Sequence, residues 1–187
     1  MVFKEPGSFE VWLTKLATAI VAKSLYKEFV DRIGLSGDER VMDYGSGAGM
    51  GSRYIAMSLS KGGHLTCVDI SKNWMEVAKK RTRDFSNVDY RLGRLRELDI
   101  PDSSYDVIVV SFVLHDVEPE ERPAMVRELV RKMKPGGRIF LREPTGKQHG
   151  MRIEQVRELM SDAGMREARS LVGKKLFEAT YVPSKAS

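Results

Sequence analysis

Cysteine is almost absent from this chain: Cys67 is the single cysteine among 187 residues. No internal disulfide can therefore form, which fits a reducing compartment. Long apolar runs are also missing, and none approaches the ~20 residues that a membrane-spanning helix needs. The first residues, MVFKEPGSFEVW, lack the basic segment and apolar stretch of a secretory signal. We therefore expect a cytoplasmic chain without a membrane span.

No block of like charge is present either. The chain carries 31 Lys and Arg against 26 Asp and Glu, a net charge of +5, but the basic residues are spread along its whole length. A basic balance points to nucleic acid only where it gathers on one face. An RNA or DNA partner is therefore left open but not favoured, and we predict no metal site.

Two signatures of phosphate-binding loops are absent from the glycine-rich stretch VMDYGSGAGMGS, residues 41–52. The loop of a nucleotide triphosphatase needs G-x-x-x-x-G-K-[ST], but neither that lysine nor that glycine spacing occurs. The dinucleotide pattern G-x-G-x-x-G fails as well, because its sixth position is Met50 counted from Gly45 and Ser52 counted from Gly47. We therefore do not expect this loop to bind a pyrophosphate.

What the chain does contain is a series of short apolar runs that alternate with helical patterns. Five runs rich in β-branched or aromatic residues, and bounded by turn residues, predict strands at 40–45, 64–69, 88–93, 105–112 and 138–144. Helices are predicted between them at 50–60, 73–84 and 120–133, and the KPGG at 134–137 predicts the end of the third. This alternation implies right-handed crossovers and a parallel sheet covered on both faces, so the predicted fold class is α/β.

The two ends of the chain have patterns of their own. A helix is predicted at 153–163, and two strand-like runs around Gly173 predict a closing hairpin. Residues 1–35 predict one or two amphipathic helices with Phe9 and Trp12 on the apolar face. Because no internal repeat, low-complexity segment or linker occurs, a chain of this length is expected to form a single domain.

The glycine loop follows the first predicted strand and has the pattern D-x-G-x-G-x-G, formed by Asp43, Gly45, Gly47 and Gly49. Glycines at this point let the backbone approach a ligand and allow helix N-terminal amides to face it. An acid two residues before the glycines suits a ligand with a cationic end. Plain turn glycines are the alternative, but open α/β sheets bind ligands where the first parallel strand ends.

These motifs, in this order, resemble those of the class I S-adenosylmethionine-dependent methyltransferases. The resemblance covers about residues 38–182 and rests on VMDYGSGAG, on the acid in TCVDISKNWMEVAKKR, and on the ungapped stretch from GRLREL to FLREP. It is closest to the small-molecule branch of ubiquinone and menaquinone biosynthesis. The resemblance implies a Rossmann-like fold with a seven-stranded, mostly parallel sheet, an antiparallel seventh strand and helices on both faces. It divides the single domain into an N-terminal helical lid, residues 1–36, and a core, residues 37–183.

The resemblance also implies the cofactor, S-adenosyl-L-methionine, and the residues that bind it. Asp69 is implied to accept hydrogen bonds from both ribose hydroxyls, and Ile70 to pack against adenine; capping of the next helix is the alternative role for Asp69. The family usually has an acid where this chain has Arg94, so the backbone of Leu95 is expected to read the adenine edge. Arg94 itself is either a solvated loop residue or a residue with a new role. The implied cofactor site thus comprises Asp43, Gly45, Gly47, Gly49, Asp69, Ile70, Arg94, Leu95 and Ser111.

His115 is the candidate catalytic residue, because it ends the fourth predicted strand in SFVLHDV, where the donor methyl is expected. Methyl transfer from a sulfonium is an in-line displacement, so alignment of nucleophile and methyl supplies much of the acceleration. A hydroxyl or a protonated amine would also need a base, and His115, Asp116 or Glu143 could take its proton. A histidine that only satisfies a backbone carbonyl is the structural alternative.

The acceptor is the least specified part of the site. No long insertion follows the fourth or fifth strand, so the N-terminal helices are expected to roof the substrate pocket, with Phe9 and Trp12 as lid residues unless they only pack on the sheet. The sequence therefore predicts a methyltransferase that acts on a small molecule. An RNA or protein methyltransferase and a non-catalytic cofactor-binding protein stay open. The missing N/D-P-P-Y/F signature disfavours enzymes that methylate planar nitrogens in nucleic acids and glutamine.

Overall fold

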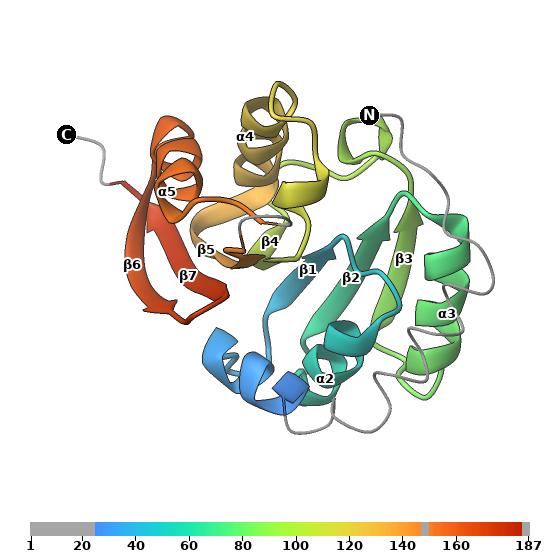
Figure 1. The fold of residues 1–187 in the computed structure, drawn as a ribbon. Coiled ribbons are helices and arrows are strands. Elements are labelled where there is room, and N and C mark those ends of the chain that lie inside the picture. The colour runs from blue at the N-terminus through green and yellow to red at the C-terminus, as the bar shows by residue number, and fades with distance from the viewer. Residues whose placement is uncertain (1–24, 147–149, 185–187) are drawn as a thin grey trace. The chain divides into compact units, whose positions relative to one another are not determined.

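The computed structural model describes residues 25–146 and 150–184 and divides into two compact units, Met1–Leu98 and Asp99–Ser187 (Figure 1). Residues 25–33 are helical. The predicted lid residues Phe9 and Trp12 lie outside the described residues. The assignment of the chain to a single domain with an N-terminal lid therefore stays a prediction, and each unit is described by itself.

The first unit contains three parallel strands: β1 (Arg40–Tyr44), β2 (His64–Asp69) and β3 (Val88–Leu92). Their order is β3-β2-β1, and helices α2 (Met50–Ser58) and α3 (Lys72–Thr82) follow β1 and β2 along the chain (Figure 1). The three central residues of β1 and every residue of β2 after His64 are buried. Such strands are apolar on both faces, which is why they read as continuous apolar runs rather than as alternating patterns.

The second unit contains four strands in the order β4-β5-β7-β6. Strands β4 (Tyr105–Ser111) and β5 (Met133–Pro144) are parallel, whereas β7 (Leu176–Pro183) is antiparallel to both β5 and β6 (Met165–Val172). Helix α4 (Arg122–Lys132) joins β4 to β5, and α5 (Ile153–Asp162) precedes β6. Two short 3-10 turns, η1 (Leu95–Glu97) in the first unit and η2 (Leu114–Asp116) here, follow the ends of β3 and β4.

The predicted fold class is confirmed. The seven strands have the order β3-β2-β1-β4-β5-β7-β6, their pairing is mostly parallel, and β7 is antiparallel to its neighbours. The closing hairpin around Gly173 is β6 and β7, as the two strand-like runs predicted. The candidate site residues lie at or just after the ends of β1, β2 and β3 in the first unit and of β4 and β5 in the second.

One boundary differs from the sequence-based expectation. The KPGG at 134–137 ends α4 at Lys132, but it lies inside β5, which begins at Met133 rather than at residue 138. The register shifts between Tyr105 and Val107, so the additional residues of β5 form a bulge. A side chain on Gly137 would meet Met133 Cγ at 2.6 Å and the Asp106 carbonyl oxygen at 3.0 Å, so this bulge requires glycine.

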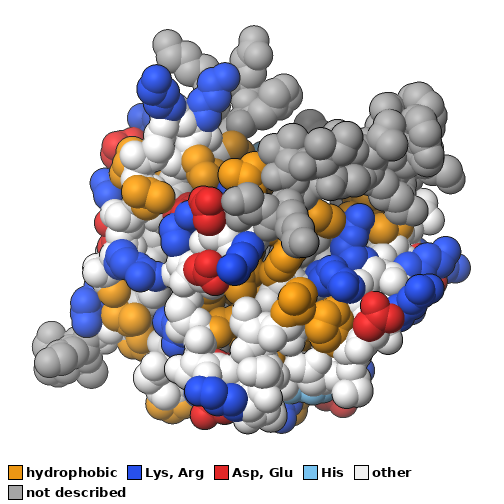
Figure 2. Space-filling model, turned by 90° about the horizontal axis from the view of Figure 1, so that it is seen from below, with side chains coloured by type: hydrophobic (Ala, Val, Ile, Leu, Met, Phe, Trp, Pro, Cys, Tyr) orange, Lys and Arg blue, Asp and Glu red, His pale blue; other side chains and the backbone are white. Residues whose placement is uncertain are grey.

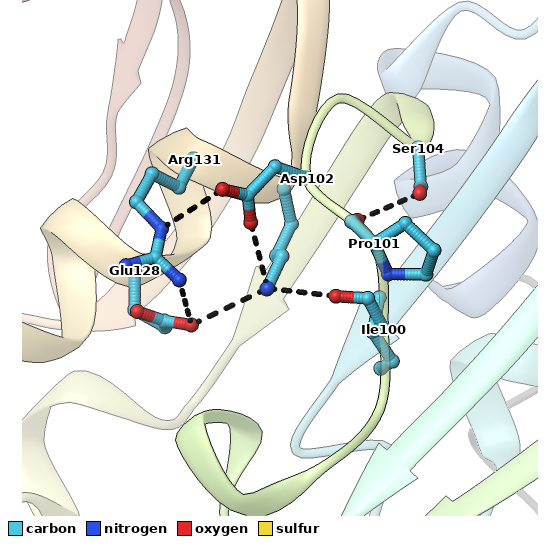
Figure 3. A network of polar contacts seen from close by, with 7 residues as sticks. Ile100, Pro101, Asp102, Ser104, Glu128 and Arg131 are labelled. Carbon is cyan, nitrogen blue, oxygen red and sulfur yellow. Dashed lines mark hydrogen bonds and ion pairs between the residues drawn. The ribbon is translucent and has the colours of Figure 1, made fainter.

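A buried lysine fixes the turn that leads into β4 (Figure 3). Lys132 is 5% exposed, and its Nζ donates to the Ile100 carbonyl at 2.7 Å and to Asp102 Oδ1 at 2.8 Å. Arg131 and Glu128 complete the network with an ion pair at 3.2 Å. Because a buried ammonium needs such partners, this network holds residues 100–104 against the end of α4.

None of the helices in the described ranges, 25–146 and 150–184, combines the length and the apolar composition needed to cross a membrane.

Candidate functional site

The glycine loop between β1 and α2 is anchored to the end of β2. The amides of Gly45 and Ser46 both donate to the Val68 carbonyl, at 2.8 and 3.1 Å, and the amide of Gly49 donates to the Ser46 carbonyl at 2.9 Å. The loop therefore folds back over the carboxyl ends of β1 and β2, where the sequence predicted a ligand site.

Two of the loop glycines are required for different reasons. Gly49 has φ +71°, and a Cβ there would lie 2.8 Å from Ala78 Cα, so only glycine lets the loop pack against α3. Gly47 has φ +51°, and a Cβ there would meet only the Gly45 carbonyl oxygen, at 3.9 Å. Within residues 25–146 and 150–184, no other atom lies within 4 Å of that position, which leaves space for a ligand to approach the backbone.

Asp69, the predicted ribose acceptor, closes the loop. It is 8% exposed, its Oδ2 accepts from the Gly47 amide at 2.7 Å, and its Oδ1 accepts from the Ser71 amide at 2.8 Å. Ser71, not Asp69, caps α3, because the Ser71 hydroxyl accepts from the Trp74 amide at 3.1 Å. The alternative in which Asp69 serves as the helix cap is therefore wrong, and Asp69 instead holds the loop that carries Gly47.

Asp43, predicted to face a cation, is buried behind the same loop. Its side chain is 4% exposed, and Oδ2 accepts a hydrogen bond of 2.6 Å from the Ser52 hydroxyl, a partner that sequence reasoning missed. Burial raises the pKa of Asp43 to about 6; the Ser52 hydrogen bond opposes that rise and the nearby charge of Asp69 adds to it. The groups that shift this pKa include no cation. The ionised form of Asp43 therefore has no positive charge among them to stabilise it.

Ser46 is a second feature that the sequence did not indicate. Its side chain is 9% exposed, and its hydroxyl has no hydrogen-bond partner within the described part of the chain. Buried hydroxyls are usually satisfied, so one left without a partner in a glycine loop is available to a ligand atom. The unfilled space beside Gly47, the Ser46 hydroxyl and the buried acid Asp43 together fit a ligand that carries hydrogen-bonding groups and a positive charge.

The remaining predicted residues of the first unit lie at the ends of β2 and β3. Ile70 directly follows β2 and is 39% exposed, which leaves an apolar side chain able to cover a ligand. The amide of Gly93 donates to the Asp69 carbonyl at 2.9 Å and so ties the exit of β3 to the loop. Arg94 is exposed and precedes η1, whereas the Leu95 side chain is 3% exposed and points into the core.

In the second unit, β4 ends at the half-buried Ser111, and the next residue is strained. Phe112 has φ +58°, a conformation that is rare for a bulky side chain. Its amide donates to the Arg142 carbonyl at 2.8 Å, and the Arg142 guanidinium lies 5.0 Å from its ring centre. Phe112 is 40% exposed. Strain of this kind gathers at functional sites, and nothing in the local sequence indicated it.

His115 lies in the η2 turn and is paired with a buried glutamate. Glu143, at the end of β5, is fully buried; its Oε1 accepts from the amides of Val113 and Leu114, both at 2.8 Å, and its Oε2 lies 2.7 Å from His115 Nδ1. His115 Nε2 lies 3.4 Å from Oδ1 of the exposed Asp116. Glu143 thus accepts from three donors, and the choice of a base among His115, Asp116 and Glu143 stays a prediction.

This pairing changes the acid–base behaviour of His115. The hydrogen bond to Glu143 raises the pKa of the imidazole above 6.5, its burial opposes that rise, and the charges of Glu143 and Asp116 add to it. The histidine therefore has a carboxylate partner rather than the backbone carbonyl of the structural alternative. An imidazole held in this way by a buried carboxylate can accept a proton at its other nitrogen.

Within the described ranges, no group of three or more His, Cys, Asp or Glu side chains could hold a metal ion. A cavity lies between α5, β6 and β7, and none of the predicted site residues lines it. That cavity has a volume of about 350 Å³ and is lined by charged and polar side chains that include Arg157, Glu167 and Tyr181. The candidate chemistry therefore lies at the ends of β1 and β2 in one unit and of β4 and β5 in the other.

A family model described as a methyltransferase domain matches residues 42–141. A ubiquinone/menaquinone biosynthesis C-methyltransferase from Vibrio vulnificus (strain YJ016) is 32% identical over 123 residues, which cover 64% of this chain and 46% of that protein. A demethylmenaquinone methyltransferase from Tropheryma whipplei (strain Twist) is 32% identical over 111 residues, 59% of this chain and 44% of that protein. The chain spans just under half the length of these curated relatives.

Solved structures agree on the fold. A SAM-dependent methyltransferase from Aquifex aeolicus has a TM-score of 0.73 at 22% identity, covering 90% of this chain and 96% of that chain. A magnesium protoporphyrin IX methyltransferase from Synechocystis PCC 6803, solved with bound SAH, has a TM-score of 0.70 at 19% identity, covering 85% of this chain and 84% of that chain. Both likenesses support the class I methyltransferase fold that the sequence motifs implied.

Proposed function

This chain belongs to the methyltransferase domain family, and on that premise we propose that it transfers a methyl group from S-adenosyl-L-methionine to a small-molecule acceptor. The observation that carries the proposal is the loop after β1, which has unfilled space beside Gly47 and a buried Ser46 hydroxyl without a partner in the described chain. The names of the quinone-biosynthesis relatives favour an aromatic, quinol-like acceptor.

These contacts suggest a specific role for several residues of the cofactor site that the sequence predicted. Asp69 accepts from the ribose hydroxyls while it holds the Gly47 amide, since each carboxylate oxygen can accept two hydrogen bonds. Ile70 covers the adenine, the backbone of Leu95 reads its edge, and Ser46 is added as a hydrogen-bonding residue. When bound, S-adenosylmethionine supplies a methyl group activated by a sulfonium charge. The other proposed contacts are those of Asp43, Gly45, Gly47, Gly49, Arg94 and Ser111.

Asp43 supplies the electrostatic part of the proposal. Its pKa of about 6 in the chain without ligand means that ionisation is costly there, and a cation bound over the loop would reduce that cost. The same acid disfavours the phosphates of NAD and ATP. The cofactor's positive charge and the buried carboxylate are therefore expected to stabilise one another.

We propose that His115 is the general base of the second unit, taking the proton of the acceptor. This role requires the neutral imidazole, so turnover is expected to rise with pH, with a midpoint above 6.5 because the pKa of His115 is raised. His115→Ala should lower turnover by roughly 10²- to 10⁴-fold with nearly unchanged cofactor affinity. A His115→Ala enzyme with full turnover at saturating acceptor would remove the base from the proposal.

Charged side chains of both signs are mixed on one face of the protein. On the face that Figure 2 shows, Lys and Arg side chains are scattered among acidic and apolar ones rather than gathered into one patch. Recognition of RNA needs such a patch. An RNA or protein methyltransferase and a non-catalytic binding protein are therefore treated as the competing outcomes of the experiment below. Cytoplasmic location and an N-terminal lid stay predictions from the sequence.

Two measurements test the proposal. Calorimetry should show binding of S-adenosylmethionine and S-adenosylhomocysteine but not of NAD or ATP, and tighter binding of NAD than of S-adenosylhomocysteine would contradict the cofactor assignment. Incubation with S-adenosylmethionine labelled at the methyl group and a cell extract, followed by separation into metabolites, RNA and protein, should place the label in the metabolites. Label in RNA or protein would select the first competing function, and no transferred label the second.

A further inference from the structure

The His115–Glu143 pair carries an inference about how the base works and which acceptors it serves. The two residues are 28 positions apart and are brought together by the parallel pairing of β4 with β5, in which Ser111 lies opposite Arg142. Glu143 is fully buried, and the contact between its Oε2 and His115 Nδ1 is 2.7 Å. A buried carboxylate accepts and does not donate, so the nitrogen that faces it carries the proton.

We propose that Glu143 is a positioning residue, which fixes His115 in the tautomer with the proton on Nδ1 and leaves Nε2 as the proton acceptor, and that the acceptor therefore carries an acidic proton on its nucleophilic group. This inference rests on the proposed methyltransferase function and narrows its substrate class. A phenol or an enol has such a proton. A thioether or a tertiary amine has none, and would gain nothing from this pair.

The geometry separates this role from simple support of the η2 turn. Glu143 Oε1 alone serves the amides of Val113 and Leu114, whereas Oε2 serves His115. The turn could thus be held by one oxygen, and the second oxygen is directed at the imidazole. Among the described residues, the other charged groups that act on the ring are the exposed Asp116, whose Oδ1 lies 3.4 Å from Nε2, and Arg122, whose guanidinium donates to the His115 carbonyl at 3.4 Å.

The proposed step couples proton transfer from the acceptor to methyl transfer. His115 Nε2 takes the proton of the acceptor, and the resulting imidazolium is paired with the Glu143 carboxylate. The electron pair released on the acceptor forms the new bond to the methyl carbon. The pair of the broken carbon–sulfur bond remains on sulfur, which becomes a neutral thioether. The proton then passes from Nε2 to water, and the neutral imidazole is restored.

The decisive variant is Glu143→Gln. Its amide oxygen can still accept from Val113 and Leu114, so the turn is kept, but its NH₂ group would face Nδ1 and donate to it. The imidazole would then carry its proton on Nε2 and could no longer accept one there. Asp116→Asn is the matched control, because it removes the other carboxylate near the ring, which is exposed and 3.4 Å away.

Nitrogen-15 NMR of histidine-labelled protein reads the tautomer directly, without acceptor or cofactor. The chain has three histidines, and His64 and His149 are assigned by substitution with Gln. The wild type should show Nδ1 protonated and Nε2 unprotonated above its titration midpoint. In Glu143→Gln the tautomer should invert and the midpoint should fall, whereas Asp116→Asn should keep the wild-type tautomer. A wild-type His115 with its proton on Nε2, or an unchanged midpoint in Glu143→Gln, would overturn the proposal.

Turnover gives the second arm once a methylated metabolite is identified. Glu143→Gln should lower kcat by roughly 10²- to 10⁴-fold with a small change in KM, and the rise of activity with pH should be lost. Unchanged kcat in a variant with an inverted tautomer would refute the positioning role. The two arms fail separately: if no methyl transfer occurs, the proposed function fails, but the NMR result still decides whether Glu143 sets the tautomer.

Discussion

At the scale of single residues, the candidate site depends on buried acids that have different tasks. Asp69 accepts two backbone amides and shapes the glycine loop, Asp43 is held by Ser52 with a raised pKa of about 6, and Glu143 organises the η2 turn and His115. Buried carboxyls are costly unless they are paired or hydrogen-bonded. Their presence at three strand ends indicates a ligand or a reaction that uses them.

Substitution of Asp43 tests its role as the counter-charge of the cofactor. Affinity for S-adenosylmethionine should rise with pH up to about 6 and then level, because the bound cation favours the ionised carboxyl over the protonated one. Asp43→Asn should weaken binding by roughly 10- to 100-fold at pH 8 and abolish that pH dependence. Calorimetry between pH 5 and pH 8 measures both; equal pH profiles in the two proteins would rule out the charge interaction.

Substitution of Asp69 tests the ribose contact. Asp69→Ala removes hydrogen bonds to a charged acceptor that are worth ~1.5 to 3 kcal/mol each, so cofactor affinity should fall by about a hundredfold or more. The variant also loses the contact to the Gly47 amide, so a melting curve must accompany the binding data. Affinity within threefold of the wild type would exclude the ribose role.

At the scale of elements, the turn from β1 to α2 combines a packing requirement with a binding surface. Gly49 is fixed by α3, because a Cβ would approach the Ala78 backbone, whereas Gly47 borders space that none of the described residues fills. The β-bulge at Gly137 shapes the first residues of β5, and the Lys132 network holds the turn before β4. The geometry of the turns and bulges at the ends of strands and helices therefore determines the positions of the site residues.

The two glycines provide a matched pair of variants. Gly47→Ala should cost only the strain of a left-handed alanine, ~1 to 2 kcal/mol in unfolding free energy, but should greatly weaken cofactor binding by filling the ligand space. Gly49→Ala adds a backbone clash to the same strain and should destabilise the protein more, by ~2 to 4 kcal/mol. Urea unfolding and calorimetry on both proteins check this. A Gly47→Ala protein that binds like the wild type would contradict a ligand beside Gly47.

At the scale of the whole molecule, the perturbed groups act together on stability. Asp43 and His115 have raised pKa values, so the stability each contributes is present at low pH and is lost as pH rises, through about 6 for Asp43 and above 6.5 for His115. Asp102 beside Lys132, and Glu167 beside Arg157, have lowered pKa values, and their contribution is lost as pH falls below the ordinary carboxyl range.

These contributions predict an acidic optimum for the protein without cofactor. The melting temperature should be highest near ~pH 5 and should decline toward pH 8. Saturating S-adenosylmethionine should raise the melting temperature most on the alkaline side, since it binds the folded protein with Asp43 ionised. Thermal unfolding from pH 3 to pH 9, with and without cofactor, provides the measurement. A maximum above pH 7 in the protein without cofactor would show that these groups do not dominate.

The sequence by itself determined the order of strands and helices, the α/β class and the position of the glycine loop after the first strand. These features depend on local periodicity and on motifs that are contiguous in the chain. It also pointed to Asp43, Gly47, Asp69 and His115, which lie at strand ends or in the turns that follow them. It could not show that Glu143 faces His115, that Ser52 donates to Asp43, or that the Ser46 hydroxyl is buried. Those facts depend on the distance between residues far apart in the chain and on burial, and only the packing of the strands and loops against one another sets them.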